Sequence, residues 1–122
     1  MPARILVLDD EPAIRALVAR ALGEEGHEVV PIENGLLGLE AAKANDFDLV
    51  ITNSCMPGMS GAEVVTRLHR LFPALPVLHL DDLSHPSGDE FPDGVRTLYK
   101  PFSIFALQEA VRKLLAGWSL AC

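Results

Sequence analysis

The chain has 122 residues, of which 49% are hydrophobic, and its formal net charge is -7. A chain of this size forms one domain with a single buried core, so we expect residues 1–122 to be one domain without an output domain. The acidic balance argues against nucleic-acid binding, which needs clustered Lys and Arg. No apolar run approaches the roughly 20 residues of a membrane span, and Met1–Arg4 leads into a strand rather than a signal peptide. Two cysteines, Cys55 and Cys122, make no disulfide framework, so a cytoplasmic location is expected.

The first third of the chain alternates between apolar runs and helix-period segments. Ile5–Leu8 is predicted to be a strand buried on both faces. A helix follows, with Pro12 in its first turn and Gly26 at its end. Its apolar stripe consists of Ile14, Leu17, Val18, Ala21 and Leu22. Glu28–Ile32 is a shorter strand, which Pro31 places at a sheet edge.

The same alternation continues to the end of the chain. Asn34 is expected to cap a second helix, whose apolar residues are Leu36, Leu37, Leu39 and Ala42. Leu49–Thr52 reads as a third strand, followed by a helix lined by Val64, Val65, Leu68 and Leu71. Val77–Leu80 and Val95–Tyr99 are predicted as the fourth and fifth strands. The last helix, which ends near Gly117, has a stripe of Leu107, Val111, Leu114 and Leu115.

One segment breaks this pattern. Asp81–Gly94 contains two prolines, two glycines and no apolar stripe. We predict a loop there, at the place where the alternation would otherwise put a fourth helix.

Strand–helix alternation of this kind predicts an α/β fold, with a parallel sheet covered by helices on both faces. In such sheets ligands bind beyond the carboxyl ends of the strands, where the strand order reverses. Polar side chains from four strands fall at those ends: Asp9, Asp10, Asn53, Asp81, Asp82 and Lys100. They predict one polar crevice at that edge of the sheet.

The order of three motifs resembles the receiver domain of bacterial two-component response regulators. These motifs are Asp9-Asp10, the strand and loop through Met56–Gly61, and Lys100-Pro101-Phe102. The resemblance covers essentially the whole chain and implies a doubly wound, flavodoxin-like sheet with strand order 2-1-3-4-5. In this family a sensor histidine kinase donates a phosphoryl group to an aspartate, with Mg²⁺ held by the acidic pair.

Four positions match the family residue by residue. The resemblance assigns Asp9 and Asp10 to the acidic pair, Lys100 to the invariant lysine, and the backbone carbonyl of Cys55 to the metal site. Three positions depart from the pattern. The phosphoacceptor position falls on Asn53, the switch hydroxyl on Asp81 and the switch aromatic on Thr97.

A neutral carboxamide lacks the anionic oxygen that attacks phosphorus, so Asn53 is not expected to accept a phosphoryl group. Losing one anionic ligand weakens Mg²⁺ binding, so we expect no required cofactor and at most weak Mg²⁺. We also expect Asp10 and Asp81, with Lys100 near them, to form a fixed charge network. Clustered acids raise the pKa of at least one carboxyl group unless Lys100 or a cation neutralises them.

The predicted function is therefore a stand-alone pseudo-receiver that is not an enzyme and acts by protein–protein contact. Its expected partner is a sensor histidine kinase or a downstream signalling protein, with no nucleic acid or membrane partner. One alternative is a receiver phosphorylated at Asp9, Asp10 or Asp81. Another is a phosphatase of the haloacid dehalogenase class, although that class carries Asp-x-Asp-x-Thr where this chain has Asp9-Asp10-Glu11-Pro12.

Simpler structural roles remain open for several of these residues. The acidic stretch that begins at Asp9 could cap the following helix, and Lys100 and Asp81 could be solvated surface charges. His79 lies in an apolar strand and is expected to be a satisfied core histidine rather than a ligand or phosphohistidine. Cys55 needs no chemical role.

Overall fold

The strands and helices follow the predicted order. The computed structural model describes residues 2–117, so Cys122 lies outside the described residues. The strands are β1 (Arg4–Leu8), β2 (Glu28–Ile32), β3 (Leu49–Asn53), β4 (Val77–Asp82) and β5 (Val95–Lys100). They form one parallel sheet in the order β2-β1-β3-β4-β5. The predicted doubly wound sheet is confirmed, with the Pro31 strand at its edge.

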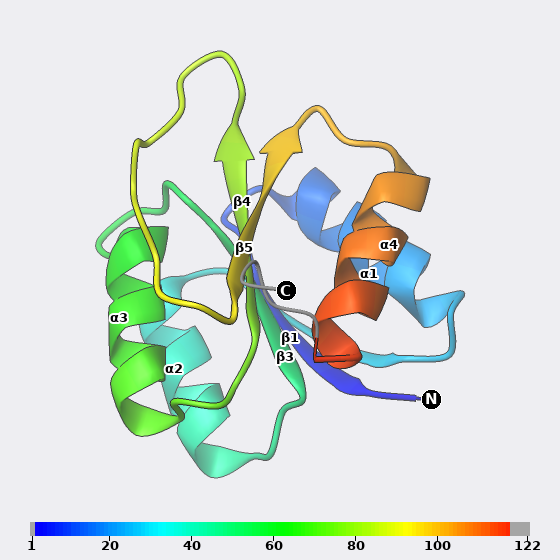
Figure 1. Ribbon diagram of the computed structural model, residues 1–122, viewed down its shortest axis with the longest axis horizontal. Coiled ribbons are helices and arrows are strands. Elements are labelled where there is room, and N and C mark those ends of the chain that lie inside the picture. Colours follow the sequence, from blue (N-terminus) through cyan, green and yellow to red (C-terminus); the bar gives the residue numbers. More distant parts are fainter. Residues whose placement is uncertain (1, 118–122) are drawn as a thin grey trace.

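The helices cover both faces of this sheet. They are α1 (Pro12–Gly23), α2 (Gly35–Ala44), α3 (Gly61–Leu71) and α4 (Ile104–Leu115). α1 and α4 lie on one face, and α2 and α3 lie on the other (Figure 1). Alternate residues along each strand point to opposite faces of the sheet and pack into the two core layers. Leu78 and Leu80 of β4, for example, pack on the side of α1 and α4. None of the helices within residues 2–117 is long and apolar enough to span a membrane.

The helix starts are set by short polar side chains, except in α1. The Asn34 side chain accepts a hydrogen bond from the backbone N–H of Leu37 at 2.9 Å, so the predicted cap of α2 is confirmed. At α1 the residue before the helix is Glu11, and its side chain makes no capping bond. The Asp9 carboxylate instead accepts from the backbone N–H of Glu11 at 2.9 Å, before the helix begins. α1 ends at Gly23, earlier than predicted, and Gly26 adopts a φ of 89° in the turn that follows.

The segment between β4 and β5 contains no helix, as predicted. β4 extends through Asp81 and Asp82, so the irregular segment is shorter than expected and comprises residues 83–94, which we call the strap. The strap rises beyond the upper end of β4 and then descends beside α3 to the start of β5 (Figure 1). It therefore occupies the place where the strand–helix alternation would put another helix.

A close backbone contact joins α3 to the end of β3. A Cβ atom at Gly61 would lie 2.2 Å from the carbonyl oxygen of Asn53 and 2.9 Å from the Cα of Ser54. Only glycine fits there, because the atoms in the way belong to the backbone.

Substituting Gly61→Ala is expected to lower the free energy of unfolding by about 1–3 kcal/mol, because the overpacked strand end must move. Gly23→Ala is the matched control: a Cβ there meets nothing within 4 Å. The control should be neutral or stabilising by up to about 1 kcal/mol, since Ala favours a helix over Gly. Urea denaturation measures both variants, and equal stability of Gly61→Ala and wild type would contradict the packing argument.

Candidate functional site

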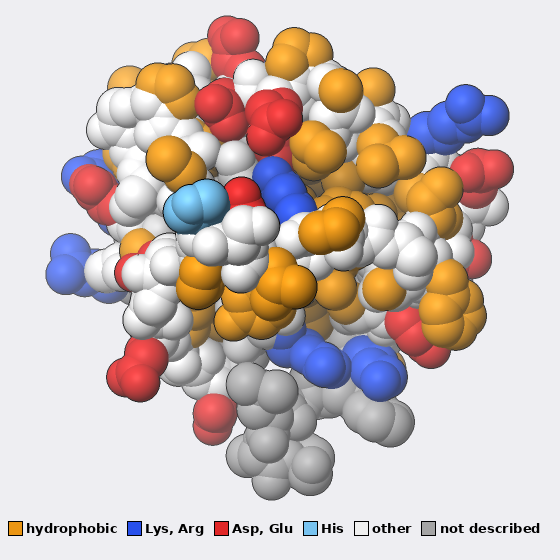
Figure 2. Space-filling view, turned by 90° about the horizontal axis from the view of Figure 1, so that it is seen from above, with side chains coloured by type: hydrophobic (Ala, Val, Ile, Leu, Met, Phe, Trp, Pro, Cys, Tyr) orange, Lys and Arg blue, Asp and Glu red, His pale blue; other side chains and the backbone are white. Residues whose placement is uncertain are grey.

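The predicted crevice forms at the carboxyl edge of the sheet. Asp9 and Asp10 directly follow β1, Asn53 ends β3, and Lys100 ends β5. Viewed from above this edge, acidic side chains gather beside a basic one near the middle of the face, with hydrophobic side chains around them (Figure 2). The topology therefore brings the four residues together as expected, because parallel strands end at the same edge.

Lys100 is the centre of the charge arrangement. Its Nζ donates to Oδ1 of Asn53 at 2.9 Å and to Oδ2 of Asp9 at 3.5 Å. Oε1 of Glu11 lies 3.8 Å from the same ammonium group. Glu11 was not among the predicted site residues, although its place directly after the acidic pair is a signal that could have found it.

Both the nitrogen and the oxygen of the Asn53 amide are hydrogen-bonded. Its Nδ2 donates to the backbone carbonyl of Cys55 at 2.9 Å and to Oδ1 of Asp10 at 3.3 Å, while its oxygen accepts from Lys100. The opposite orientation would turn the amide N–H groups toward the ammonium and the amide oxygen toward two acceptors. The hydrogen-bond network therefore fixes the orientation of the amide. Only 7% of Asn53 is exposed, so these bonds replace hydration.

Asp9 shows the expected rise in pKa, but with a different main cause. Burial raises the pKa of Asp9, which is fully buried, and the nearby Glu11 carboxylate raises it further. The backbone N–H of Glu11 and the Lys100 ammonium oppose this rise without cancelling it. Desolvation, rather than repulsion among clustered acids, is thus the dominant effect.

Asp81 does not join this network, so the expected network of Asp10, Asp81 and Lys100 is wrong. Asp81 Oδ2 accepts from the Ser87 backbone N–H at 3.0 Å and from Ser87 Oγ at 2.9 Å, while its Oδ1 accepts from the Asp82 N–H at 2.9 Å. Burial alone would raise the pKa of Asp81, but the hydrogen bonds from Ser87 and Asp82 outweigh it and lower the pKa. Asp81 is 4% exposed, so it is not a solvated acid either. It anchors the strap instead.

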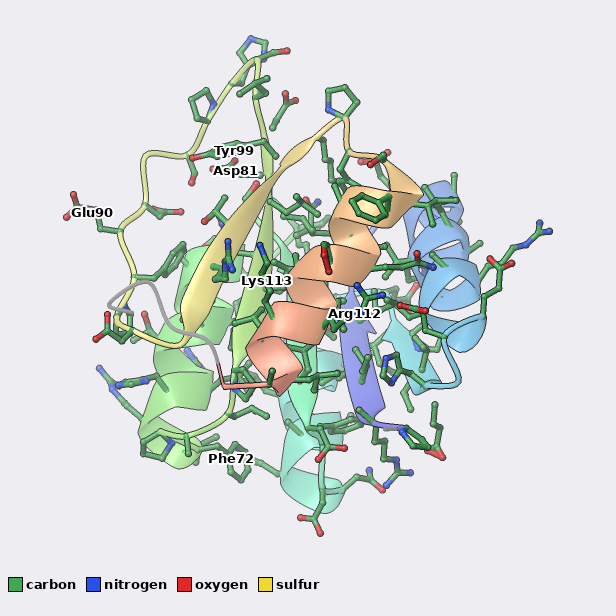
Figure 3. The ribbon with its side chains drawn as sticks, turned by 45° about the vertical axis from the view of Figure 1, so that its right-hand side comes forward. Phe72, Asp81, Glu90, Tyr99, Arg112 and Lys113 are labelled. Carbon is green, nitrogen blue, oxygen red and sulfur yellow. The ribbon has the colours of Figure 1, made fainter. Side chains whose placement is uncertain are left out.

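Thr97 lies in β5 away from the crevice. Its hydroxyl is 3.5 Å from Nδ1 of His79. The aromatic side chain in this part of β5 is Tyr99, which pairs with Asp81 across the strands and is 44% exposed (Figure 3). Thr97 has no ring that could swing between two positions, so no aromatic switch is built at this position.

The residues present do not favour a magnesium site. Carboxylate and carbonyl oxygens are the ligands that Mg²⁺ prefers, and Asp9, Asp10 and the Cys55 carbonyl supply them. However, the Asn53 amide donates to Asp10 and Cys55, and the Lys100 ammonium lies against Asp9. Within residues 2–117, no group of three or more His, Cys, Asp or Glu side chains is arranged to hold a metal. That the protein needs no cofactor and binds Mg²⁺ at most weakly stays a prediction.

A doubly wound sheet with an acidic pair and a lysine at its carboxyl edge defines a receiver domain of two-component signalling. The chain belongs to the family described as response regulator receiver domain, whose family model matches residues 5–112. Receiver domains are, in general, signalling modules rather than enzymes.

Curated relatives differ in how much of their length this chain covers. The probable transcriptional regulatory protein TcrX of Mycobacterium tuberculosis is 33% identical over 93% of this chain and 50% of that protein. The transcriptional regulatory protein TcrA of the same organism is 46% identical over 63% of this chain and 30% of that protein. The chain thus spans half or less of these two regulators. The response regulator receiver protein CpdR of Brucella abortus is 28% identical over 92% of this chain and 96% of that protein.

Solved structures share the fold over nearly the whole chain. The chemotaxis response regulator CheY4 of Vibrio cholerae has a TM-score of 0.81 and 27% identity, covering 93% of this chain and 99% of that one. The receiver domain of the hybrid histidine kinase CckA has a TM-score of 0.79 and 32% identity, covering 92% and 98%.

Substituting Asn53→Asp is expected to create a cation dependence that the wild type lacks. Without divalent cations the variant loses the two amide N–H bonds and gains a fourth clustered carboxylate, lowering the free energy of unfolding by about 1–3 kcal/mol. Added Mg²⁺ should then raise its melting temperature by mass action, with no shift in wild type. Asn45→Asp, the same change at the exposed end of α2, is the control and should not respond. A magnesium shift in wild type would contradict the closed arrangement.

Substituting Asp81→Asn is expected to loosen the strap and to lower the free energy of unfolding by about 1–3 kcal/mol, since charged hydrogen bonds are lost. Because the folded pKa of Asp81 is lowered from 3.8, its stabilisation is present above that pH and is lost as the pH falls through the folded pKa. The deficit of the variant should therefore shrink in acid, measured by denaturation at several pH values. Asp82→Asn, which removes the charge but keeps an acceptor oxygen for the exposed bond from the Ser84 N–H, should cost less; an equal cost would argue against the anchor.

Proposed function

We propose that this protein is a pseudo-receiver that signals by protein–protein contact without phosphorylation of an aspartate. The observation that carries the proposal is the Asn53 amide, which bridges Lys100 to Asp10 and the Cys55 carbonyl. A phosphoryl acceptor must present an anionic oxygen to phosphorus. The amide oxygen of Asn53 is neutral and is already the acceptor of the lysine.

Other acids in the crevice are poorly placed to act as acceptors. Asp9 is fully buried beside Lys100, and Asp81 is tied to Ser87 and Asp82. Asp10 is exposed, but Oδ1 of its carboxylate accepts the Asn53 amide. These contacts support the pseudo-receiver over a receiver that uses another acid. The sequence after β1 also lacks the Asp-x-Asp-x-Thr of haloacid dehalogenase phosphatases.

The surface beside the crevice supports docking of a protein partner. A hollow of about 380 Å³ is lined by Ile14, Leu17, Asp82, Lys100, Pro101 and Phe102. Ile104 and Phe105, at the start of α4, are exposed, and Phe105 is 71% accessible. Grouped exposed apolar side chains mark interaction sites. The proposed partner is a sensor histidine kinase or a downstream signalling protein in the cytoplasm, with no nucleic acid or membrane involved.

Phosphoryl transfer provides the direct test. Wild type incubated with acetyl phosphate and Mg²⁺ should keep its intact mass, because no anionic nucleophile occupies position 53. The Asn53→Asp variant should gain one phosphoryl group, and its adduct should disappear in mild base, as an acyl phosphate does. The double variant Asn53→Asp with Lys100→Met shows whether the phosphoryl transfer needs the lysine: an adduct on the double variant means that the carboxylate alone is sufficient. A stoichiometric adduct on wild type would overturn the proposal, and peptide mapping would identify the acid used.

A further inference from the structure

The strap is fastened in its first half, up to Ser87, and at its β5 end. At the β4 end, Leu83 N–H donates to the Lys100 carbonyl at 3.2 Å, and His85 N–H donates to the Asp82 carbonyl at 3.2 Å. At the β5 end, Val95 N–H donates to the Pro92 carbonyl at 3.3 Å. Between these points the strap runs past α3, and the labelled Glu90 points away from the molecule (Figure 3). A segment with few backbone bonds opens at a lower free energy than the surrounding sheet.

One aromatic side chain of the strap covers a buried histidine. The Phe91 ring lies 4.6 Å from the His79 ring, centroid to centroid, at an interplanar angle of 59°. His79 is fully buried in β4, and Phe91 packs against the core layer of α2 and α3. Within the described residues, Nε2 of His79 has no hydrogen-bond partner, and Nδ1 has only the distant Thr97 hydroxyl at 3.5 Å. The expected place of His79 in the core is confirmed by its burial, but the expectation that its ring is satisfied is wrong. A buried polar atom without a partner costs free energy, which opening the strap would recover through water.

We propose that the strap is a pH-sensitive latch: protonation of His79 lifts Phe91 and opens residues 88–94, which follow the Ser87 anchor, while the sheet stays folded. In the closed strap an imidazolium would be buried with one weak partner. In the open strap the same cation would be hydrated. The inference goes beyond the pseudo-receiver function, and it holds or fails whether or not position 53 accepts phosphoryl groups.

The two carboxylates that act on His79 belong to β4 and to the strap. β4 contributes Asp81 and the strap contributes Asp89; both carboxylates favour the protonated ring. β5 contributes only the uncharged Thr97 hydroxyl. α3 places His69 and Arg70 on the cavity of about 270 Å³ that separates it from the strap, opposite Asp89 and Glu90.

The balance of these effects sets the direction of the switch. Burial lowers the pKa of His79, and the attraction of Asp81 and Asp89 offsets only part of that effect. The closed form therefore keeps the ring neutral at pH 7, whereas in the open form the ring has its ordinary value of about 6.5. As the pH falls below that value, the open form binds more protons. The open-to-closed ratio then rises by up to about tenfold per pH unit until the lowered pKa of the closed form is reached.

Hydrogen exchange of the full chain tests the latch. After correction for intrinsic rates, amides of residues 88–94 should open at least about fivefold more often at pH 5.5 than at pH 7.5, while core amides of β1 should not change. His79→Leu replaces the imidazole with an apolar side chain of similar size, and residues 88–94 of this variant should lose the pH response. His69→Gln and His85→Gln, at exposed positions on α3 and the strap, are matched controls and should keep it.

A second measurement covers the case in which His79→Leu does not fold. NMR titration of wild type should show the His79 ring and the amides of residues 88–94 changing with one common midpoint, below the ordinary pKa of a histidine. An unchanged pH response in His79→Leu, or titration of His79 without change in the strap, would overturn the latch. Parallel opening of β1 would also overturn it, because that would be global unfolding.

Discussion

The arrangement of the carboxyl edge depends on one amide bonded on both sides. Three acids and a lysine meet there, and Asp9 is fully buried. A buried carboxylate is stable only when it is paired and hydrogen-bonded. Lys100 supplies the positive charge. The Asn53 amide oxygen accepts from that ammonium, and the amide nitrogen donates to Asp10 and to the Cys55 carbonyl. A carboxamide suits this position because it both donates and accepts, so it satisfies a cation on one side and anionic or carbonyl oxygens on the other.

A molecular switch needs an element with two arrangements that a ligand or modification distinguishes. The resemblance to receiver domains assigns this element to Asp81 and Thr97. Asp81 holds the strap through Ser87, and Thr97 carries no ring that can move. The crevice and the β4 end of the strap are therefore held by two separate hydrogen-bond networks. Lys100 belongs to the first network and Asp81 to the second. The movable element that we propose lies elsewhere, where Phe91 covers a histidine whose Nε2 has no hydrogen-bond partner among residues 2–117.

The sequence predicted the fold and the place of the site because both follow from periodicity. Runs such as Ile5–Leu8 and the polar residues that follow them determine which side chains meet at the sheet edge. Partner choice within the crevice could not be read in the same way. Successive residues of a strand point to opposite faces, and the pairing of Asp81 with Ser87 depends on the path of an irregular segment that has no period. The unpartnered Nε2 of His79 likewise depends on where Phe91 lies, which no spacing in the chain records.

The hydrogen bonds of Asn53 also have a structural role. The Asn53 amide binds the Cys55 carbonyl, and the Asn53 backbone lies against Gly61 at the start of α3, so the loop between β3 and α3 is fixed at both ends. The Lys100 side chain, bonded to that amide, belongs to the hollow that α1 and the loop before α4 share. A residue at position 53 that could not make these bonds would leave the loop and the lysine without their common partner. The same side chain on which the proposed pseudo-receiver function depends thus also preserves the shape of the face on which a partner would dock.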